Sequence, residues 1–589
     1  MKRIIRQILG WGMMLTLPLM MTSCGELFDM LDNPITPALQ VLRAQLTLKV
    51  GESKPIQAST QAHVVLLYSS DNPAVATVDA TGLITAVSPG TARITIKAQG
   101  EDDYYRTGIF SENTTTVEVT VNKGDGSISY ANADVTKNYG DAKFVNQLTI
   151  VGDGTVSYSS SNEEVATVNP ATGDVTIVDG GKVTITATTT STDNYVYETT
   201  AAKYTLNIYR LIDLSTLTAD FTAKDNYILT GTLAGNYKIS IADNANIELK
   251  DATINSADVN DDNYRWAGLT CKGNANITIT GTNTIRRFCN SFSGIQAGKI
   301  GTTLTIDGTG LLTAIGGNYA SGIGSGQNAS CGSITINGGT INANSTDDGS
   351  GIGSGQSYAS CGNITINGGT VNARSRDYGA GIGSGNYYST CGKIIINDGI
   401  INASSGGWGA GIGSGNNQSN CDDITIYGGD ITAYSSQEGA GIGSGNLNSQ
   451  CSNIIIYGGS ITAYSSQKGA GIGSGSCESS CGDITINGGT VIASSGDAGA
   501  GIGSGSNSTF GSITITSGIT QVQATTNYTD AWPIGKGYLD QSSSSSAVTI
   551  AGVTVTGRDW TSTSLPGLNF ATSSTGGTNL TWTLTPKVP

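Results

Sequence analysis

The chain has 589 residues, of which 82 are Gly, and only 13% of its residues are charged. Its 30 basic and 45 acidic residues give a net charge of −15. An acidic surface repels phosphate backbones, so we do not expect nucleic acid as a partner. Runs of Leu, Ala, Glu and Lys at helical spacing are missing, and short Ile/Val/Thr runs alternate with Gly, Asn, Asp and Ser. This composition predicts an all-β protein.

The start of the chain predicts a signal peptide over residues 1–23. Three basic residues among the first six precede an apolar stretch over residues 8–21, and Thr22, Ser23 and Cys24 follow. This pattern resembles the cleavage box of bacterial lipoproteins, which implies a lipid on the Cys24 thiol. The alternative is a simple secretory signal that contains a Cys. We therefore expect a lipid-anchored protein of the outer membrane, exposed on the cell surface of a Gram-negative bacterium.

Two segments that follow the tether (residues 24–40) resemble each other. Tyr68 begins Tyr-Ser-Ser-Asp-Asn-Pro-Ala-Val-Ala-Thr-Val, and Tyr158, 90 residues later, begins Tyr-Ser-Ser-Ser-Asn-Glu-Glu-Val-Ala-Thr-Val. Each segment continues into a strand with alternating apolar residues, which predicts a small antiparallel sandwich. Both are similar to the group 2 bacterial immunoglobulin-like (Ig-like) domain. The resemblance implies two spacer or adhesive domains without chemistry of their own, over residues 41–122 and 123–209.

A 30-residue repeat occupies the chain from Ser321 to Thr516. Each unit reads Gly-Ala-Gly-Ile-Gly-Ser-Gly, a variable loop, Cys, and then Ile-Thr-Ile-Asn-Gly-Gly-Thr-Val/Ile-x-Ala. Three short strands separated by Gly turns predict one coil of a parallel β-helix (β-solenoid), which needs neighbouring coils to bury its apolar edge. In one unit, the residues predicted to point inward are Ile352, Ile364, Ile366, Val371 and Ala373. We place the β-helix at residues 210–557 and a C-terminal cap at residues 558–589.

Sequence phrases in the first coils of the predicted β-helix resemble segments of known proteins. The phrases Tyr227-Ile-Leu-Thr-Gly-Thr-Leu, Ile247-Glu-Leu-Lys-Asp-Ala-Thr-Ile and Ile277-Thr-Ile-Thr-Gly-Thr-Asn-Thr-Ile are similar to carbohydrate-binding-like β-helix segments of bacterial secreted proteins. This resemblance implies a binding role.

Six of the ten Cys residues are spaced 30 residues apart: Cys331, Cys361, Cys391, Cys421, Cys451 and Cys481. In-register coils place them in one column at ~4.8 Å spacing. Three interpretations stay open: a ladder of buried thiols, pairwise disulfides in an oxidising compartment, or a metal column, which lacks the C-x-x-C pairing of zinc sites.

Few residues suggest catalysis. His63 is the only His in the chain, so a Ser-His-Asp or Cys-His arrangement in the β-helix is impossible. The Gly-Ile-Gly-Ser-Gly motifs are not followed by a helix, which argues against nucleotide binding. Asp347, Asp348 and Asp377 lie in one loop column and could bind a cation, or they are solvated turn residues. We expect no catalytic site, no metal and no cofactor.

Aromatic side chains at variable positions are the candidate ligand-binding residues. Flat rings on a rigid face can stack on sugar rings, although stacking between coils that only stiffens the β-helix is the alternative. The candidates are Tyr427, Tyr457, Tyr434, Tyr464, Trp408, Tyr378, Tyr387 and Tyr388.

The sequence therefore predicts a monomeric, non-catalytic surface lipoprotein that presents a β-helix for adhesion or for binding a polysaccharide or surface glycan. Two other classes stay open: a polysaccharide lyase or glycoside hydrolase of the β-helix type, and a structural protein of the envelope or of a fimbria.

Overall fold

The structure is a computed structural model of the chain. It describes residues 36–60, 64–100, 112–255, 260–542, 546–562, 564–575 and 579–587. The predicted signal peptide, Cys24 and His63 lie outside these residues. The chain divides into two compact units, residues 1–136, 140–178 and 183–206, and residues 137–139, 179–182 and 207–589. Each unit is considered by itself.

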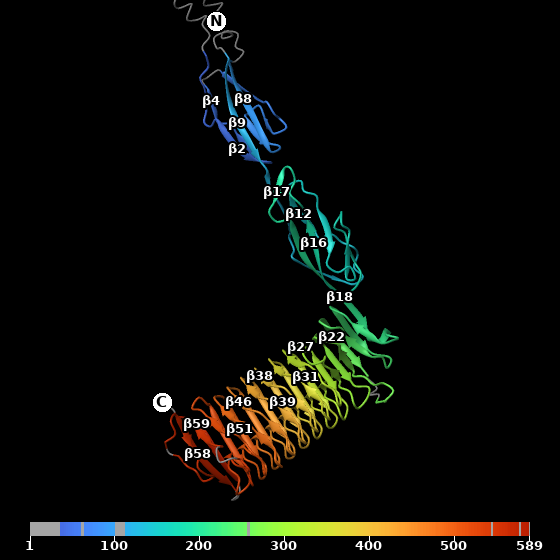
Figure 1. Cartoon of the computed structure of the whole chain (residues 1–589), viewed down its shortest axis with the longest axis vertical. Helices are drawn as coiled ribbons and strands as arrows, with labels where there is room; N and C mark the ends of the chain where they lie inside the picture. The colour runs from blue at the N-terminus through green and yellow to red at the C-terminus, as the bar shows by residue number, and fades with distance from the viewer. Residues whose placement is uncertain are drawn as a thin grey trace, which may run out of the picture. The chain divides into compact units, whose positions relative to one another are not determined.

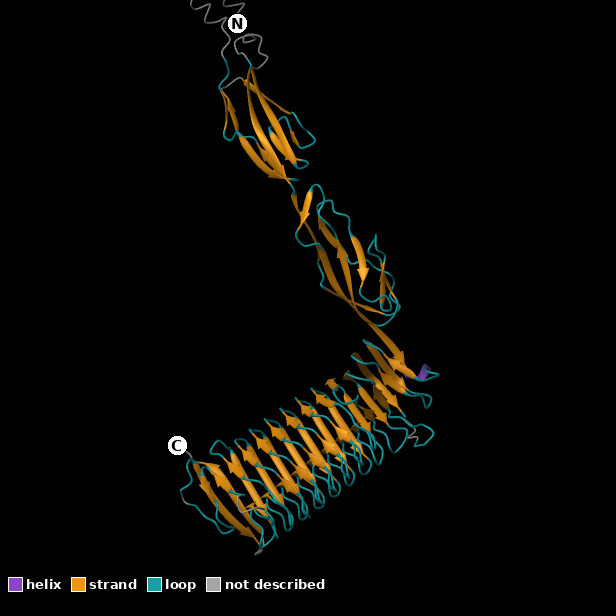
Figure 2. Cartoon of the chain, in the orientation of Figure 1, coloured by secondary structure: helices purple, strands orange, loops and turns teal. Residues whose placement is uncertain are grey.

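The described residues form strands and loops, and the one helical element among them is the 3-10 turn η1 (Leu214–Thr216), as Figure 2 shows. The prediction of an all-β protein is therefore confirmed. Within these residues, no helix has the length and apolarity that a bilayer crossing requires.

The first sandwich of unit 1 has a four-stranded sheet in the order β2-β9-β8-β5 and a three-stranded sheet in the order β3-β7-β6. Alternating side chains of these strands fill its core, including Ile84, Ile94 and Val119, which are fully buried. The strands are β1 (Leu39–Val41), β2 (Gln45–Lys49), β3 (Ser53–Pro55), β4 (Ala58–Thr60), β5 (Val64–Ser70), β6 (Ala76–Val78), β7 (Leu83–Ala86), β8 (Gly90–Gly100) and β9 (Asn113–Asn122).

The second sandwich repeats this plan and buries Val175, Ile185 and Tyr197. Its strands are β10 (Gly124–Tyr130), β11 (Asp134–Asn138), β12 (Leu148–Val151), β13 (Ser157–Ser160), β14 (Ala166–Val168), β15 (Val175–Ile177), β16 (Gly181–Thr188), β17 (Tyr195–Tyr197) and β18 (Ala201–Asp213). The prediction of purely antiparallel sandwiches is wrong in one detail, because β2 pairs with β9 and β10 pairs with β17 in parallel. Most of a domain separates the two strands of each pair, and a connection of that length allows a parallel neighbour.

Unit 2 is a parallel β-solenoid, visible in Figure 1 as a ladder of strands. One coil consists of β32 (Ile352–Gly353), β33 (Ser360–Cys361), β34 (Ile364–Ile366) and β35 (Thr370–Ser375), and the next coil repeats them as β36 to β39. Equivalent residues pair in parallel and in register, for example Ile364 with Ile394. The prediction of a parallel β-helix with about 30 residues per coil is confirmed.

The predicted inward residues of this coil are buried. Ile352, Ile364, Ile366 and Val371 have no exposed surface, and Ala373 is 1% exposed. Each buried aliphatic side chain contributes about 1.5–3 kcal/mol through the hydrophobic effect. The apolar columns of stacked coils therefore form one continuous core along the solenoid.

Serine columns also lie inside the solenoid, which the apolar pattern did not predict. Ser354, Ser384 and Ser414 are fully buried. The Ser384 hydroxyl accepts a hydrogen bond of 3.0 Å from the backbone N–H of Gly415 in the next coil, and the other members repeat this contact. A buried N–H without a partner costs about 1–3 kcal/mol, so this column stabilises the stacking of coils.

Glycine is required where the turn with the Gly-Ile-Gly-Ser-Gly motif approaches the next coil. Gly413 has φ +136°, and a Cβ atom added there would come 1.8 Å from the carbonyl oxygen of Gly443. The repeated Gly-Ile-Gly-Ser-Gly motif therefore allows close packing of adjacent backbones.

The cysteine column consists of buried free thiols, and all nine described Cys residues are unpaired. Between 1% and 6% of the surface of its six members is exposed. Of the three interpretations, the structure has the ladder of buried thiols, which fills one corner of the core.

A hairpin covers the C-terminal end of unit 2. At the C-terminal end, β54 (Gln521–Thr526) pairs antiparallel with β59 (Asn579–Pro586), which pairs with β58 (Leu568–Thr575) and buries Trp582. This hairpin covers a sheet edge that would otherwise be open to another chain.

At the other end, the carboxylate of Asp179 accepts hydrogen bonds from Tyr227 (2.7 Å), Arg210 (2.6 Å) and Lys224 (2.9 Å). Burial raises the pKa of Asp179, but these three donors outweigh it and hold the pKa well below its usual range. The ionised form of Asp179 is thus part of the folded structure.

Candidate functional site

The first predicted pair of aromatic residues lies in the turn between β42 (Ile424–Ile426) and β43 (Asp430–Ser435) and in the equivalent turn of the next coil. Tyr427 and Tyr457 lie in adjacent coils, with ring centroids 5.0 Å apart and planes 5° from parallel. They are 53% and 49% exposed. About half of each side chain is therefore open to solvent.

An amide ladder leads to this pair. The Asn367 side chain donates to Asn337 (2.7 Å), and the Asn397 side chain donates to Asn367 (2.6 Å). Tyr427 takes the next position, so the ladder ends there and Asn397 keeps a free amide oxygen as far as the described residues are concerned. A flat ring thus adjoins a hydrogen-bond acceptor, the combination that sugar rings with hydroxyl groups require.

A second group of aromatic residues lies at the loop corner, which we define as residues 376–379 and 385–389 with their equivalents in the other coils. Tyr378 stacks on Trp408 of the next coil, with centroids 4.9 Å apart and planes 14° from parallel. The backbone N–H of Asn416 donates to the Tyr378 carbonyl oxygen (2.9 Å), which joins the two loops of the corner.

Three tyrosines lie in the second loop of this corner. Tyr358 and Tyr388 stack with centroids 5.1 Å apart, and Tyr387 meets both of them edge-on. Tyr387 and Tyr388 have φ values of +63° and +53°, so this loop holds two consecutive left-handed residues. Tyr358, which is 65% exposed, was missed by sequence reasoning, although it lies 30 residues before the predicted Tyr388.

The third predicted pair is engaged within the protein. Tyr434 on β43 and Tyr464 on β47 (Ser460–Ser465) stack at 5.5 Å, and both are half-buried. The Tyr434 hydroxyl is 2.8 Å from the Ser466 hydroxyl. Strand β43, which carries Tyr434, runs from the turn with Tyr427 to the loop corner, and its six extended residues span about 20 Å. The candidates therefore form two surfaces, the pair at Tyr427 and Tyr457 and the loop corner.

Charged side chains share the loop corner with the aromatic rings. The column that contains Tyr378 and Trp408 also contains Tyr319 and Asp348 in the preceding coils and Glu438 and Lys468 in the following coils. Asp348 is 7% exposed. Burial, together with the neighbouring charges of Asp347 and Asp377, raises the pKa of Asp348 to about 7.

Glu438 has partners that Asp348 lacks. Its carboxylate lies 2.9 Å from the Lys468 ammonium and accepts hydrogen bonds from Ser476 (2.8 Å) and Asn446 (3.1 Å). Burial raises the pKa of Glu438, but Lys468 and Ser476 outweigh it, and the pKa lies below its usual value.

No three His, Cys, Asp or Glu side chains converge closely enough to hold a metal ion in the described part of the chain. The sequence left open a cation at Asp347, Asp348 and Asp377, and the structure does not give these three a metal-binding geometry.

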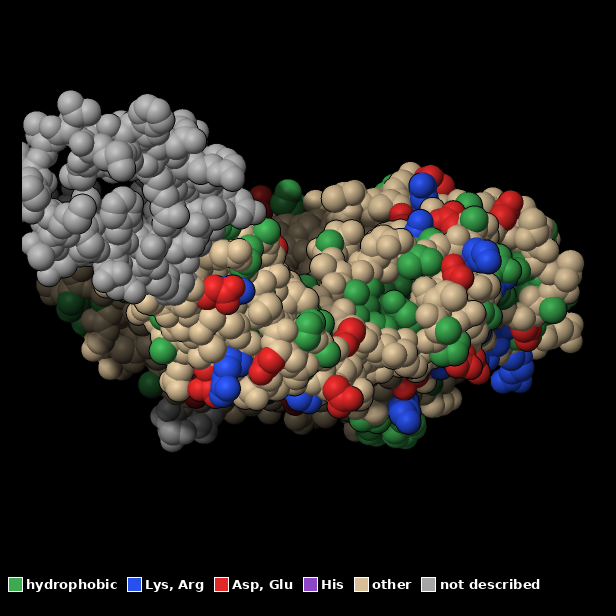
Figure 3. Space-filling view, turned by 90° about the horizontal axis from the view of Figure 1, so that it is seen from above, with side chains coloured by type: hydrophobic (Ala, Val, Ile, Leu, Met, Phe, Trp, Pro, Cys, Tyr) green, Lys and Arg blue, Asp and Glu red, His purple; other side chains and the backbone are tan. Residues whose placement is uncertain are grey.

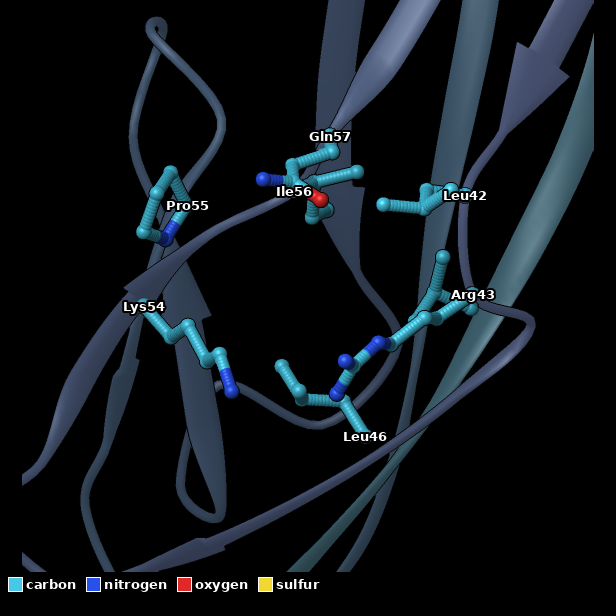
Figure 4. A pocket seen from close by; sticks show the side chains of 8 residues that line it. Leu42, Arg43, Leu46, Lys54, Pro55, Ile56 and Gln57 are labelled. Atoms are coloured by element: carbon cyan, nitrogen blue, oxygen red, sulfur yellow. The ribbon is translucent and has the colours of Figure 1, made fainter.

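A cavity of about 160 Å³ opens in the first sandwich, away from the predicted site residues. Leu42, Leu46 and Ile56 line it, and Figure 4 shows the Arg43 and Lys54 side chains pointing toward its open centre. An apolar cavity of about 150 Å³ holds a benzene-sized group. Sequence reasoning predicted no ligand there.

Charged groups do not gather into a patch of one sign on the face seen in Figure 3. Acidic and basic side chains are scattered there among uncharged polar side chains and backbone. This face favours no highly charged partner.

Two family profiles match the chain. The group 2 bacterial Ig-like domain matches residues 35–106 and 142–199. The beta helix repeat matches residues 304–327, 334–356, 364–386, 394–416, 424–446, 454–476 and 484–506. The chain combines group 2 bacterial Ig-like domains with a repeat β-helix. The expected Ig-like domains and β-helix repeats are thereby confirmed. No curated protein matches this Ig-like and β-helix chain.

Three solved structures each resemble less than a third of the chain. Domains 4 and 5 of the S-layer protein SbsC are 19% identical, with 29% of this chain and 98% of that chain covered and a TM-score of 0.18. A SusE-like surface-located polysaccharide-binding protein from Bacteroides thetaiotaomicron is 14% identical, with 29% and 34% covered and a TM-score of 0.14. Drosophila N-cadherin EC1-3 is 11% identical, with 31% and 69% covered and a TM-score of 0.14. TM-scores this low support no conclusion on function.

Proposed function

We propose that the β-helix is a non-catalytic carbohydrate-binding module of a bacterial surface lipoprotein, and that the Ig-like domains are its spacers. The observation that carries this proposal is the exposed ring pair of Tyr427 and Tyr457 beside the free amide oxygen of Asn397. The neighbouring coils have Asn at the same position, so the fold itself does not require a ring there.

The stacked pair has two outer ring faces, one toward Asn397 and one toward Asn487. Asn is short enough to leave room above the outer part of each ring. A pyranose ring can stack on such a face while its hydroxyls bond to the Asn397 oxygen and to the tyrosine hydroxyls. Stacking of the two tyrosines on each other holds both rings in place before a ligand arrives, which reduces the entropy cost of binding.

Surface location rests on the chain's N-terminal sequence. The signal segment and Cys24 support export and a lipid anchor. Metabolic labelling with an alkyne-modified fatty acid tests the anchor: the full-length protein incorporates the label and the Cys24→Ala variant does not. Label in the variant would contradict an anchor at Cys24.

Native affinity electrophoresis in gels that contain starch, xylan or galactomannan tests binding. We expect at least one of these polysaccharides to retard the full-length protein. The double variant Tyr427→Asn/Tyr457→Asn keeps the fold, since it installs the residue of the neighbouring coils. It should weaken binding about 5-fold or more, because each ring contributes on the order of 0.5–1.5 kcal/mol.

Ile492→Asn is the matched control. Ile492 is 38% exposed on β51 (Thr490–Ser495), and its column carries Asn in earlier coils. This variant should bind like the wild type. Equal loss in both variants, absence of binding to every polysaccharide, or release of reducing ends from any of them would contradict the proposal.

A further inference from the structure

The cavity of the first sandwich lies where the chain passes from one sheet to another. Strand β1 pairs with β4, whereas β2 pairs with β9 in the four-stranded sheet. Most of the lining residues come from the link between β1 and β2, from β3 and from the link between β3 and β4. Strands β2 and β3 are edges of their sheets, and within the described residues no further strand pairs with the outer side of either. The opening between them is therefore a consequence of the strand order.

The floor of this cavity is apolar. Val117 of β9 is 2% exposed, and Leu46 and Ile56 are partly buried against the core of the sandwich. Leu42 also lines the cavity, although 69% of its surface is exposed. A ligand that covers these side chains removes apolar surface from water, which favours binding. The volume of about 160 Å³ suits one benzene-sized group.

Two cations border the same opening. Figure 4 shows the Arg43 guanidinium and the Lys54 ammonium reaching toward its centre from opposite sides. None of the eight lining residues is acidic, although acidic residues outnumber basic ones in the whole chain by 45 to 30. The charge at this opening is therefore opposite in sign to the net charge of the protein.

Other lysines of the first sandwich have acidic partners. Lys49 pairs with Asp125, and Lys97 pairs with Glu112. In contrast, Arg43 and Lys54 form no ion pair with any residue that the structure describes. Two like charges directed at one opening repel each other, and an anion between them relieves this repulsion.

We infer that this cavity of the first Ig-like domain binds an apolar carboxylate, with its apolar part on the floor of the cavity and its carboxylate between Arg43 and Lys54. The arginine fork matches the two oxygens of a carboxylate, and the lysine adds a point charge. The inference is independent of the proposed carbohydrate binding by the solenoid, and it gives this domain a role besides that of a spacer. A free acid and the C-terminal residue of a peptide share this chemistry.

The first comparison separates the charge of the ligand from its shape. Phenylacetate and phenylacetamide have the same ring, and each is titrated into the full-length protein at near-physiological salt with detection by ligand-observed NMR. We expect phenylacetate to bind about fivefold or more tightly than the amide, because each partly exposed ion pair strengthens binding by a factor of about two or more. Higher salt should reduce this preference.

Two further probes complete the series. Acetate has the charge without the ring, so it should bind about tenfold or more weakly than phenylacetate. The tripeptide Gly-Gly-Phe, with a free or an amidated C-terminus, represents the end of a peptide. A preference for the charged form in either pair supports the inference, and the pair that shows the stronger preference identifies the source of the carboxylate.

The variant Arg43→Gln/Lys54→Gln should remove the preference for the charged ligand. Both side chains are exposed, so the domain should keep its fold, which circular dichroism checks. The control Lys143→Gln/Lys203→Gln has the same net charge, since it removes two exposed lysines from the second sandwich, and it should keep the preference.

Three results would overturn the inference: equal binding of the charged and the neutral form in both pairs, equal loss of preference in the lysine control, or absence of binding by every ligand of the series. Each of them leaves the proposed function standing, because the polysaccharide gels test the solenoid separately.

Discussion

The variant Asp348→Asn should stabilise the solenoid at pH 8 and have little effect at pH 4. The carboxylate is buried beside Asp347 and Asp377, and its pKa is about 7 instead of 3.8. Between these values the folded state holds a proton that the unfolded state has lost, so stability falls as the pH rises. At about 1.4 kcal/mol per pH unit, the free energy of unfolding of the wild type falls by about 4 kcal/mol over this range.

An asparagine has the same shape and stays neutral, so it avoids this loss. The gain of the variant over the wild type should grow from near zero at pH 4 to about 2–4 kcal/mol at pH 8. Differential scanning calorimetry of both proteins across this range measures the difference. An equal difference at both pH values, or destabilisation by the variant at pH 8, would refute the view that an unpaired buried carboxylate occupies this corner.

Three further predictions concern the scaffold. Asp179→Asn should destabilise unit 2 by about 1–3 kcal/mol at pH 7. Because the folded pKa is depressed, the difference should shrink as the pH falls below about 4, and thermal unfolding at pH 7 and pH 3 checks it. Gly413→Ala should prevent folding of the solenoid, since its Cβ would clash with the next coil. Gly368→Ala should fold, because its Cβ meets only one atom, at 3.3 Å; circular dichroism compares the two variants. Iodoacetamide should modify Cys477, which is partly exposed, before the buried Cys481, as mass spectrometry of the native protein would show; equal rates would contradict the closed thiol column.

The sequence predicted those parts of the fold that recur with a fixed spacing. The Ile364 and Ile366 columns follow from a 30-residue period with alternating apolar residues, and the same offset placed Tyr427 above Tyr457. Strict repetition determines register in a parallel solenoid, because equivalent residues of adjacent coils pair directly.

The rest depended on contacts that no spacing reveals. Ser354 is polar and yet fully buried, because its hydroxyl accepts a backbone N–H from the next coil. Asp348 resembled an ordinary turn residue until its partner Asn386, 38 residues later, was placed beside it. Asp348 and Glu438 differ in the residue of the following coil, Tyr378 or Lys468, and in their other charged and polar neighbours. Only the folded corner brings these groups together.

The most direct measurement of the central claim is a structure of the protein with an oligosaccharide from the polysaccharide that retards it most strongly. The account predicts a sugar ring stacked on the outer face of Tyr427 or Tyr457, with a hydroxyl donating to the Asn397 oxygen. A sugar bound without contact to either of these rings, or to the Tyr378–Trp408 stack, would contradict the account.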